Sequence, residues 1–318
     1  MSEINGNRFI FIGGAPRSGT TLLHNMLDSH PEIYGGPEFL HLKDIIDLRR
    51  KLYGSIEKEW IDVFCTYEEA DAHLRTLVEN MLLPLADRKN LKYISEKTPE
   101  NILVFSELLN LFPDAHFIHI IRDPRAIVSS LLQVRNRAIA KGMKPPGITA
   151  NIQTAIRHTK NCIVAGLQAA KAAPDRIHTV VYEQLVREPE TESKALCDFL
   201  NIEWHENMLF PGKQKHDGEK AITEKSGQIW YDKKTYYSNP DTNKLDQWKT
   251  NLSARKQLTV SLAFKSLKNQ LMQYGYDLSP DSFNFGKRVE GIAYNYVTHF
   301  NFLVFQGLRF YQTKFAKH

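Results

Sequence analysis

The sequence predicts an α/β fold in which helices flank a central parallel sheet. Short apolar runs alternate along the chain with longer stretches of helical periodicity. This alternation of strands and helices favours parallel pairing, because each strand returns to the sheet through a helical crossover. A chain of 318 residues with 42% hydrophobic and 24% charged residues is long enough and apolar enough to bury such a core.

The expected strands are short apolar runs, and they cover residues 9–12, 93–95, 117–121 and 177–182. Helical periodicity predicts the helices between and after them, with stop signals at Ser29-His30-Pro31, Pro84 and Phe112-Pro113-Asp114. These helices are expected at residues 20–28, 67–83, 100–111, 123–134, 150–172 and 252–274. Residues 233–240 are expected to form a loop, and Pro84 is expected to end or kink its helix.

The composition argues against several classes of protein. Cys65, Cys162 and Cys197 are far apart and odd in number, which argues against a disulfide framework or a zinc site. A net charge of +5 fits a polyanionic ligand but is too small to indicate nucleic acid as a partner. The N-terminus lacks the apolar segment of a signal peptide, and no run reaches membrane-spanning length. We therefore expect a cytoplasmic protein with reduced thiols.

A glycine-rich turn separates the first expected strand from the first expected helix. Backbone N–H groups in such a turn, together with the helix N-terminus, point at a bound anion. Gly14 and Gly19 have the spacing of the nucleotide-binding pattern GxxxxGK(S/T), but Thr20 takes the lysine position and the positive charge lies at Arg17. This favours a phosphate-like ligand over ordinary ATPase chemistry. The expected binding residues are Gly14, Ala15, Pro16, Arg17, Ser18, Gly19, Thr20 and Thr21.

A second anion site is expected directly after the apolar strand at residues 117–121. Arg122 follows the end of this strand, and Ser130 lies about two turns along the next helix, whose first turn contains Pro124. One guanidinium and one hydroxyl can together hold a phosphate. Since ligands of open parallel sheets bind beyond the carboxyl ends of the strands, both anion sites are expected at the same edge.

The paired motifs GAPRSGTTLL and IRDPRAIVSS resemble the 5′- and 3′-phosphate sites of sulfotransferases, which use 3′-phosphoadenosine 5′-phosphosulfate (PAPS) as donor. The resemblance covers about residues 8–200 and implies a P-loop NTPase-like three-layer fold, a PAPS site and no metal ion. In the family, an arginine and a serine eight residues later hold the 3′-phosphate, and Arg122 and Ser130 keep that spacing. Tyr182 resembles a tyrosine that lies near the donor nucleotide in the family. Ser226 resembles a serine late in the family's sequence that contacts the 3′-phosphate.

Within the family, the chain is most similar to tyrosylprotein sulfotransferases and related bacterial sulfotransferases. The stretch from residue 27 to Glu38 resembles the one that carries their catalytic glutamate, which implies that Glu38 is the general base. The segment Ser95-Glu96-Lys97-Thr98-Pro99 resembles the one that carries their catalytic lysine, which implies that Lys97 and Arg17 stabilise the transition state. The tyrosylprotein enzymes carry disulfide-bonded cysteines beside both segments, and this chain has none there.

The expected activity is therefore transfer of a sulfuryl group from PAPS to an acceptor hydroxyl. The favoured acceptor is a tyrosine in a protein or peptide. A carbohydrate or a small-molecule hydroxyl is the alternative acceptor, because variable loops build acceptor pockets. Two other classes stay open from the residues alone. One is a P-loop kinase or NTPase, against which Thr20 argues, and the other is a non-catalytic binding protein.

Residues 1–280 are expected to form the sulfotransferase domain, and residues 281–318 an aromatic-rich helical extension. Apolar residues recur there at helical spacing, which suits a packed helix, a homodimer contact or a helix lying on a membrane surface. A second feature outside the motifs is a basic stretch of Arg135, Arg137, Lys141 and Lys144. It fits either a solvated loop or a contact with an acidic acceptor.

Overall fold

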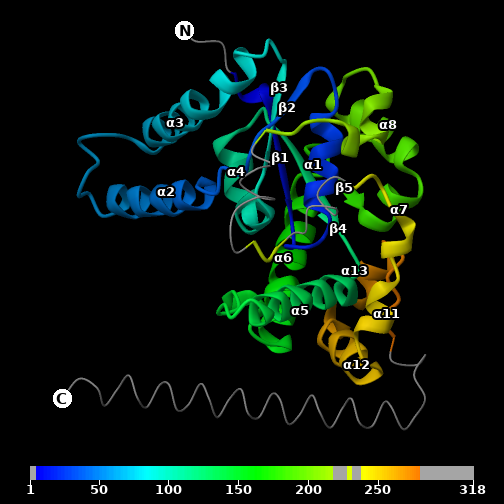
Figure 1. Cartoon of the computed structure of the whole chain (residues 1–318). Helices are drawn as coiled ribbons and strands as arrows, with labels where there is room; N and C mark the ends of the chain where they lie inside the picture. Colours follow the sequence, from blue (N-terminus) through cyan, green and yellow to red (C-terminus); the bar gives the residue numbers. More distant parts are fainter. Residues whose placement is uncertain (1–4, 218–227, 231–237, 280–318) are drawn as a thin grey trace, which may run out of the picture. The chain divides into compact units, whose positions relative to one another are not determined.

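Five apolar strands form one sheet in the computed structural model of this protein, which describes residues 5–217, 228–230 and 238–279 (Figure 1). The strands are β1 (Phe9–Gly14), β2 (Ile33–Gly35), β3 (Tyr93–Lys97), β4 (His116–Ile121) and β5 (Ile177–Val181). Their order is β2-β3-β1-β4-β5, and every neighbouring pair is parallel. Each position of the central strand β1 is buried, and the expected parallel α/β sheet is confirmed.

The chain divides into two compact units. The first holds the whole sheet and consists of Met1–Arg122, Arg137–Met143 and Asn161–Thr242, and the second consists of Asp123–Asn136, Lys144–Lys160 and Asn243–His318. Two helices, α5 (Pro124–Ala140) and α6 (Ile152–Ala172), contribute residues to both units. The expected extension at 281–318 and the residue Ser226 lie outside the described residues.

In the first unit, helices cover the sheet on both sides. These helices are α1 (Thr20–Asp28), α4 (Phe105–Leu111), α7 (Tyr182–Arg187) and α8 (Pro189–Leu200). Figure 1 shows α1 and α8 on one side of the strands and α4 on the other. The core beneath α4 is aromatic. The Phe112 ring lies near the rings of Phe9 and Phe11, and the Phe11 ring also lies near that of Phe117, with neighbouring ring centroids 5.1–5.4 Å apart.

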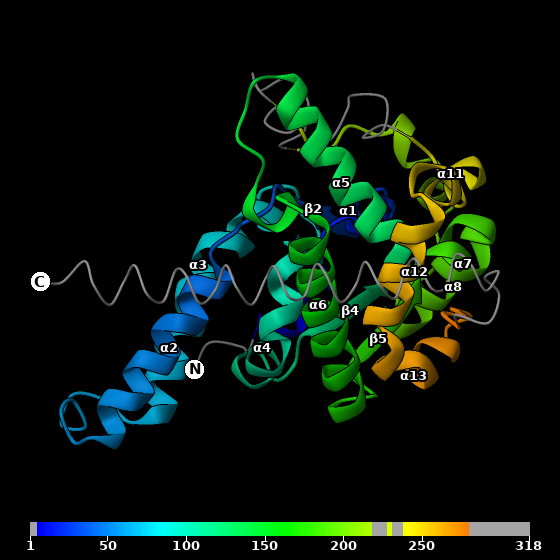
Figure 2. The ribbon, with the colours of Figure 1, turned by 90° about the horizontal axis from the view of Figure 1, so that it is seen from below.

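The helices α2 (Leu42–Glu57) and α3 (Tyr67–Asp87) form a hairpin that extends away from the sheet in both views (Figures 1 and 2). The Arg49 guanidinium donates two hydrogen bonds, 2.6 and 2.8 Å long, to the Asp71 carboxylate and so joins the two helices. Thr66 and Glu69 form a reciprocal capping box that starts α3. The sequence patterns did not predict α2.

The second unit is built from short helices. In addition to the first part of α5, it contains α11 (Gln247–Asn251), α12 (Ala254–Ala263) and α13 (Lys268–Met272). The guanidinium carbon of Arg125 lies 4.3 Å above the centre of the Trp248 ring and so joins α5 to α11. Within the described ranges of the whole chain, no helix has both the length and the apolar character needed to cross a membrane.

Four of the expected helices differ in the structure, and the one expected at 123–134 extends to Ala140 as α5. The helix expected to end or kink at Pro84 continues to Asp87, because Leu83 and Ala86 on either side of Pro84 are buried and their packing outweighs the missing N–H. The helix expected at 100–111 begins as a 3-10 helix, η2 (Pro99–Val104), before α4. The helix expected at 252–274 is divided into α12, the 3-10 helix η7 (Lys265–Leu267) and α13.

His119 of β4 makes the stability of the core depend on pH. Its ring faces Gly166 of α6 so closely that a Cβ atom on Gly166 would lie 2.3 Å from the His119 Nε2 atom. Burial lowers the pKa of His119 from 6.5 to about 4. The unfolded chain therefore takes up a proton at a higher pH than the folded chain does. It follows that this histidine lowers the free energy of unfolding as the pH falls from 6.5 towards 4.

We predict that His119→Leu removes this contribution. Between pH 7 and pH 4.5 the variant should lose about 2 kcal/mol less of its free energy of unfolding than the parent, as measured by urea denaturation. His73→Leu, at an exposed position of α3, is the control and should follow the parent. Equal losses in the parent and the His119 variant would show that His119 is not buried in its neutral form.

Candidate active site

The turn between β1 and α1 has the backbone form of an anion-binding loop. Arg17 and Gly19 have φ angles of 77° and 105°, both in the left-handed region, and such alternation of backbone conformation turns N–H groups to one side. Gly19 is the N-cap of α1, and no side chain caps this helix. The Ser18 Oγ atom is buried with no hydrogen-bond partner among the described residues, as expected of a group that awaits a ligand.

Arg122 and Tyr182 pack against this loop from the next two strands of the sheet. Arg122 follows β4, and its Nη1 atom donates a 3.1 Å hydrogen bond to the carbonyl oxygen of Arg17. The Arg122 guanidinium carbon lies 4.1 Å from the centre of the Tyr182 ring, and a Cβ atom on Gly19 would lie 2.1 Å from that ring. The Arg122 Nε atom is buried and has no hydrogen-bond partner in the described part of the chain. Arg122 therefore keeps a donor for an anion beside the loop.

Lys97, which is buried, and Glu38, which is partly exposed, form an ion pair next to the same loop. Lys97 is the last residue of β3, and only 3% of its side chain is exposed. Its Nζ atom binds the Glu38 carboxylate and lies 3.5 Å from the Thr21 Oγ1 atom. A buried ammonium needs an opposite charge, and Glu38 supplies it from the segment that follows β2. Lys97 is thus a buried lysine that pairs with Glu38 and not an exposed surface lysine.

Two residues that the sequence patterns missed hold the segment that carries Glu38. One is Glu96, which is 3% exposed and accepts hydrogen bonds from the Phe39 N–H, the Thr98 hydroxyl and the Asn101 side-chain amide. Burial raises the pKa of Glu96 above the ordinary carboxyl value. An acidic residue within a short strand, next to the predicted catalytic lysine, is the signal that could have identified it.

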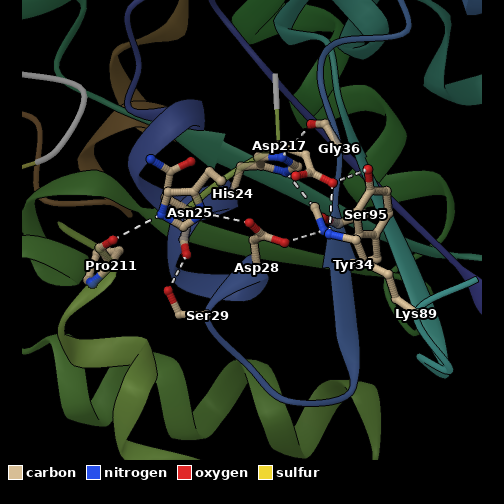
Figure 3. Close-up of polar contacts among 12 residues, drawn as sticks. His24, Asn25, Asp28, Ser29, Tyr34, Gly36, Lys89, Ser95, Pro211 and Asp217 are labelled. Carbon is tan, nitrogen blue, oxygen red and sulfur yellow. Dashed lines mark hydrogen bonds and ion pairs between the residues drawn. The ribbon is translucent and has the colours of Figure 1, made fainter. Parts of the chain in front are cut away.

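The other missed residue is His24 of α1, shown in Figure 3. Its Nε2 atom lies 3.0 Å from the Gly36 carbonyl oxygen, and its Nδ1 atom lies 3.1 Å from the Ser95 Oγ atom. Burial and the charge of Lys97 lower the pKa of His24 to about 4, so the ring is neutral near pH 7. Neutral His24 donates from Nε2 to Gly36 and accepts from Ser95 at Nδ1.

A polar cluster contacts β2 through Asp28 of α1 and through the chain near residues 89 and 216 (Figure 3). The Asp28 carboxylate accepts a 2.5 Å hydrogen bond from the Gly35 N–H, and its other oxygen lies 2.5 Å from His216 Nδ1. Tyr34 and Lys89 both donate to the Asp217 carboxylate, over 3.0 and 2.7 Å. These contacts join β2 to the chain near residue 216 and fix the strand from which the Glu38 segment departs.

The two remaining predicted site residues are Ser130 and Ser226. Ser130 is half-buried in α5 and belongs to the second unit, so its partnership with Arg122 stays a prediction. Ser226 lies outside the described residues. Among the residues that are described, no group of three or more histidine, cysteine, aspartate or glutamate side chains could hold a metal ion. All three cysteines are free, and the cytoplasmic location stays a prediction.

The basic stretch is largely bound to the chain's own backbone. Arg137 donates to the Ile229 carbonyl oxygen over 2.7 Å, and Lys141 donates to that of Gln228 over 2.6 Å. Arg135 donates to the Ala150 carbonyl oxygen over 3.0 Å. These contacts favour a structural role for three of the four basic residues rather than a contact with an acidic acceptor.

Comparisons with known proteins agree with this arrangement. Residues 9–206 match the model of the sulfotransferase family. Protein-tyrosine sulfotransferase A of Caenorhabditis elegans is 31% identical over 212 residues, which cover 63% of this chain and 52% of that protein. Protein-tyrosine sulfotransferase 1 of Danio rerio is 33% identical over 202 residues, which cover 63% and 55%. The chain thus spans about half the length of the curated relatives that it matches.

A solved structure shares the fold. The sulfotransferase domain from the Synechococcus PCC 7002 olefin synthase superposes with a TM-score of 0.56 at 23% identity, over 88% of this chain and 98% of that domain. The match confirms the expected P-loop NTPase-like arrangement of a parallel sheet between helices.

We predict that Gly19→Ala lowers the free energy of unfolding by about 2 kcal/mol or more. An alanine is strained at a φ of 105°, and its Cβ atom would overlap the Tyr182 ring. Urea denaturation measures the loss. Gly54→Ala, in α2, is the matched control, because a Cβ atom there meets nothing within 4 Å and a helix favours alanine. A Gly19 variant as stable as the parent would contradict the close contact between the loop and Tyr182.

Proposed function

Because this chain belongs to the sulfotransferase family, we propose that it transfers a sulfuryl group from PAPS to an acceptor hydroxyl. The observation that carries the proposal is the convergence of the loop, Arg122, Lys97 and Glu38 beyond the carboxyl ends of neighbouring parallel strands. Each of these groups has the charge or hydrogen-bonding capacity that one part of the reaction needs.

For the donor, we assign the 5′-phosphate to the loop and the 3′-phosphate to Arg122. Buried Ser18 Oγ and Arg122 Nε, which have no hydrogen-bond partner among the described residues, fit anionic oxygens as their missing acceptors. Arg17 adds charge within the loop, and the start of α1 adds backbone N–H groups. Ser130, eight residues after Arg122 in the sequence, is the proposed second group on the 3′-phosphate.

For catalysis, we assign the proton transfer to Glu38. The acceptor oxygen forms a bond to sulfur while the bond between sulfur and the 5′-phosphate oxygen breaks, and Glu38 takes the hydroxyl proton. Lys97 and Arg17 stabilise the negative charge that builds up on the leaving phosphate oxygen. The ion pair between Lys97 and Glu38 supports this division, because it keeps one side chain as an ammonium and the other as a carboxylate.

We propose a tyrosine hydroxyl in a protein or peptide as the acceptor. The support is the similarity to relatives named protein-tyrosine sulfotransferase. A phenol, with a pKa of about 10, loses its proton more readily than an aliphatic alcohol, so one positioned carboxylate suffices as the base. A carbohydrate or small-molecule hydroxyl is the alternative acceptor, and transfer assays with both classes distinguish the two.

Calorimetric binding of adenosine 3′,5′-bisphosphate, with ADP and ATP–Mg²⁺ for comparison, tests the donor site. We predict that the parent binds the 3′-phosphorylated nucleotide at least about tenfold more tightly than ADP, because charge-assisted hydrogen bonds to Arg122 favour it. Arg122→Ala should abolish that preference, whereas Arg50→Ala, on the exposed face of α2, should keep it. A preference for ATP–Mg²⁺ in the parent would instead favour a kinase or NTPase.

Glu38→Gln tests the catalytic assignment. We predict a loss of about 100-fold or more in kcat for sulfuryl transfer to a tyrosine peptide, because the amide cannot accept the proton. The affinity for adenosine 3′,5′-bisphosphate should stay near that of the parent. Glu57→Gln, at an exposed position of α2, is the control and should leave both quantities unchanged. Full activity in the Glu38 variant would remove it from the mechanism.

A further inference from the structure

The segment that carries Glu38 is held through its backbone by residues at the end of β3. The Phe39 N–H donates to the Glu96 carboxylate over 3.1 Å, and the Leu40 N–H donates to the Thr98 hydroxyl over 3.3 Å. The two residues that directly follow Glu38 are therefore both fixed by the neighbours of Lys97 in the sequence. Contacts to backbone N–H groups fix the path of the chain whichever side chains it carries.

Glu96 determines which group donates and which accepts in these hydrogen bonds. Its carboxylate also accepts a 2.6 Å hydrogen bond from the Thr98 hydroxyl and one from the Asn101 side-chain amide. Because a carboxylate can only accept, the Thr98 hydroxyl must donate to it and keeps its lone pairs for the Leu40 N–H. Glu96, Thr98 and Asn101 are all buried, at 3%, 8% and 1% exposed, so water does not compete for these bonds.

The backbone at Leu40 needs such support. Leu40 has a φ of 65°, in the left-handed region that a branched side chain avoids. Its side chain cannot hold the turn by packing, because the residue is 59% exposed. The hydrogen bonds to Thr98 and Glu96 thus stabilise the turn directly after Glu38.

We propose that Glu96 is a positioning residue, whose carboxylate fixes the backbone on which Glu38 stands and so sets where Glu38 receives the acceptor proton. This inference rests on the proposed function. Successive residues of a strand point to opposite faces, so β3 holds Glu38 in two ways. Lys97 binds the Glu38 side chain from one face, and Glu96 binds the adjoining backbone from the other. Two residues before Glu38, the Gly36 carbonyl oxygen is hydrogen-bonded to His24 (Figure 3).

Glu96→Ala, Glu96→Gln and Thr98→Val test the proposal with PAPS and a tyrosine peptide. Glu96→Ala should lower kcat by about 10- to 100-fold, because it removes the acceptor of three hydrogen bonds. Glu96→Gln should regain most of the rate, since its carbonyl oxygen can still accept from Phe39 and Thr98. The affinity for adenosine 3′,5′-bisphosphate should stay within about twofold of the parent in each. If Glu96→Ala does not fold, Thr98→Val still tests the proposal. It removes the Leu40 contact and one donor to Glu96 but keeps the Phe39 contact, and it should lower kcat by a few-fold.

Two measurements separate positioning from general damage to the fold. In a Glu38→Gln background, adding Glu96→Ala should cost no more than about twofold, because the base that it positions is already absent. With peptides of fluorinated tyrosines, the loss caused by Glu96→Ala should grow as the pKa of the acceptor phenol rises. Losses that multiply in the double variant, or that are equal for every phenol, would overturn the positioning role.

The behaviour of the parent protein distinguishes a failure of the proposed function from a failure of the positioning role of Glu96. A parent that binds no adenosine 3′,5′-bisphosphate and transfers no sulfuryl group overturns the proposed function, and the role of Glu96 falls with it. A parent that transfers the group, together with a Glu96→Ala variant that keeps the full rate, overturns the positioning role alone.

Discussion

Parallel pairing of the strands is the constraint on which the candidate active site depends. The carboxyl ends of parallel strands meet at one edge of a sheet, so the residues that follow them become neighbours whatever their distance in sequence. Every strand of the described sheet supplies a group there. The loop follows β1, Glu38 follows β2, Lys97 ends β3, Arg122 follows β4 and Tyr182 follows β5.

Two carboxylates a short distance apart have different surroundings, and this decides what each can do. Glu38 is a quarter exposed and pairs with a buried ammonium, so it is charged and within reach of a substrate. Glu96 is buried and satisfied by three hydrogen-bond donors, so its oxygens are already used. A fully bonded buried acid rigidifies its neighbours, whereas a partly exposed one can exchange a proton.

The part of the chain that matches the sulfotransferase family contains this whole framework. Residues 9–206 include all the strands of the described sheet, the loop and the residues that hold Glu38. The relatives named protein-tyrosine sulfotransferase are about twice as long as the part of them that this chain covers. The shared region therefore contains the residues that we propose bind the donor and take the acceptor proton. The acceptor depends on surfaces that are less constrained by the sheet.

The sequence by itself determined the parallel α/β class, the helix α1 and the loop before it, because these follow from local periodicity and glycine spacing. Its motifs also pointed to Glu38, Lys97 and Arg122. Only the tertiary structure decided what holds Glu38. Glu96 and Phe39 are 57 residues apart, and β2 has three residues, too few to show a periodic pattern. It also decided that α3 passes through Pro84, since burial of the flanking residues outweighs local propensity. Local patterns report the conformation of a segment, whereas burial and hydrogen-bond partners depend on what the fold brings beside it.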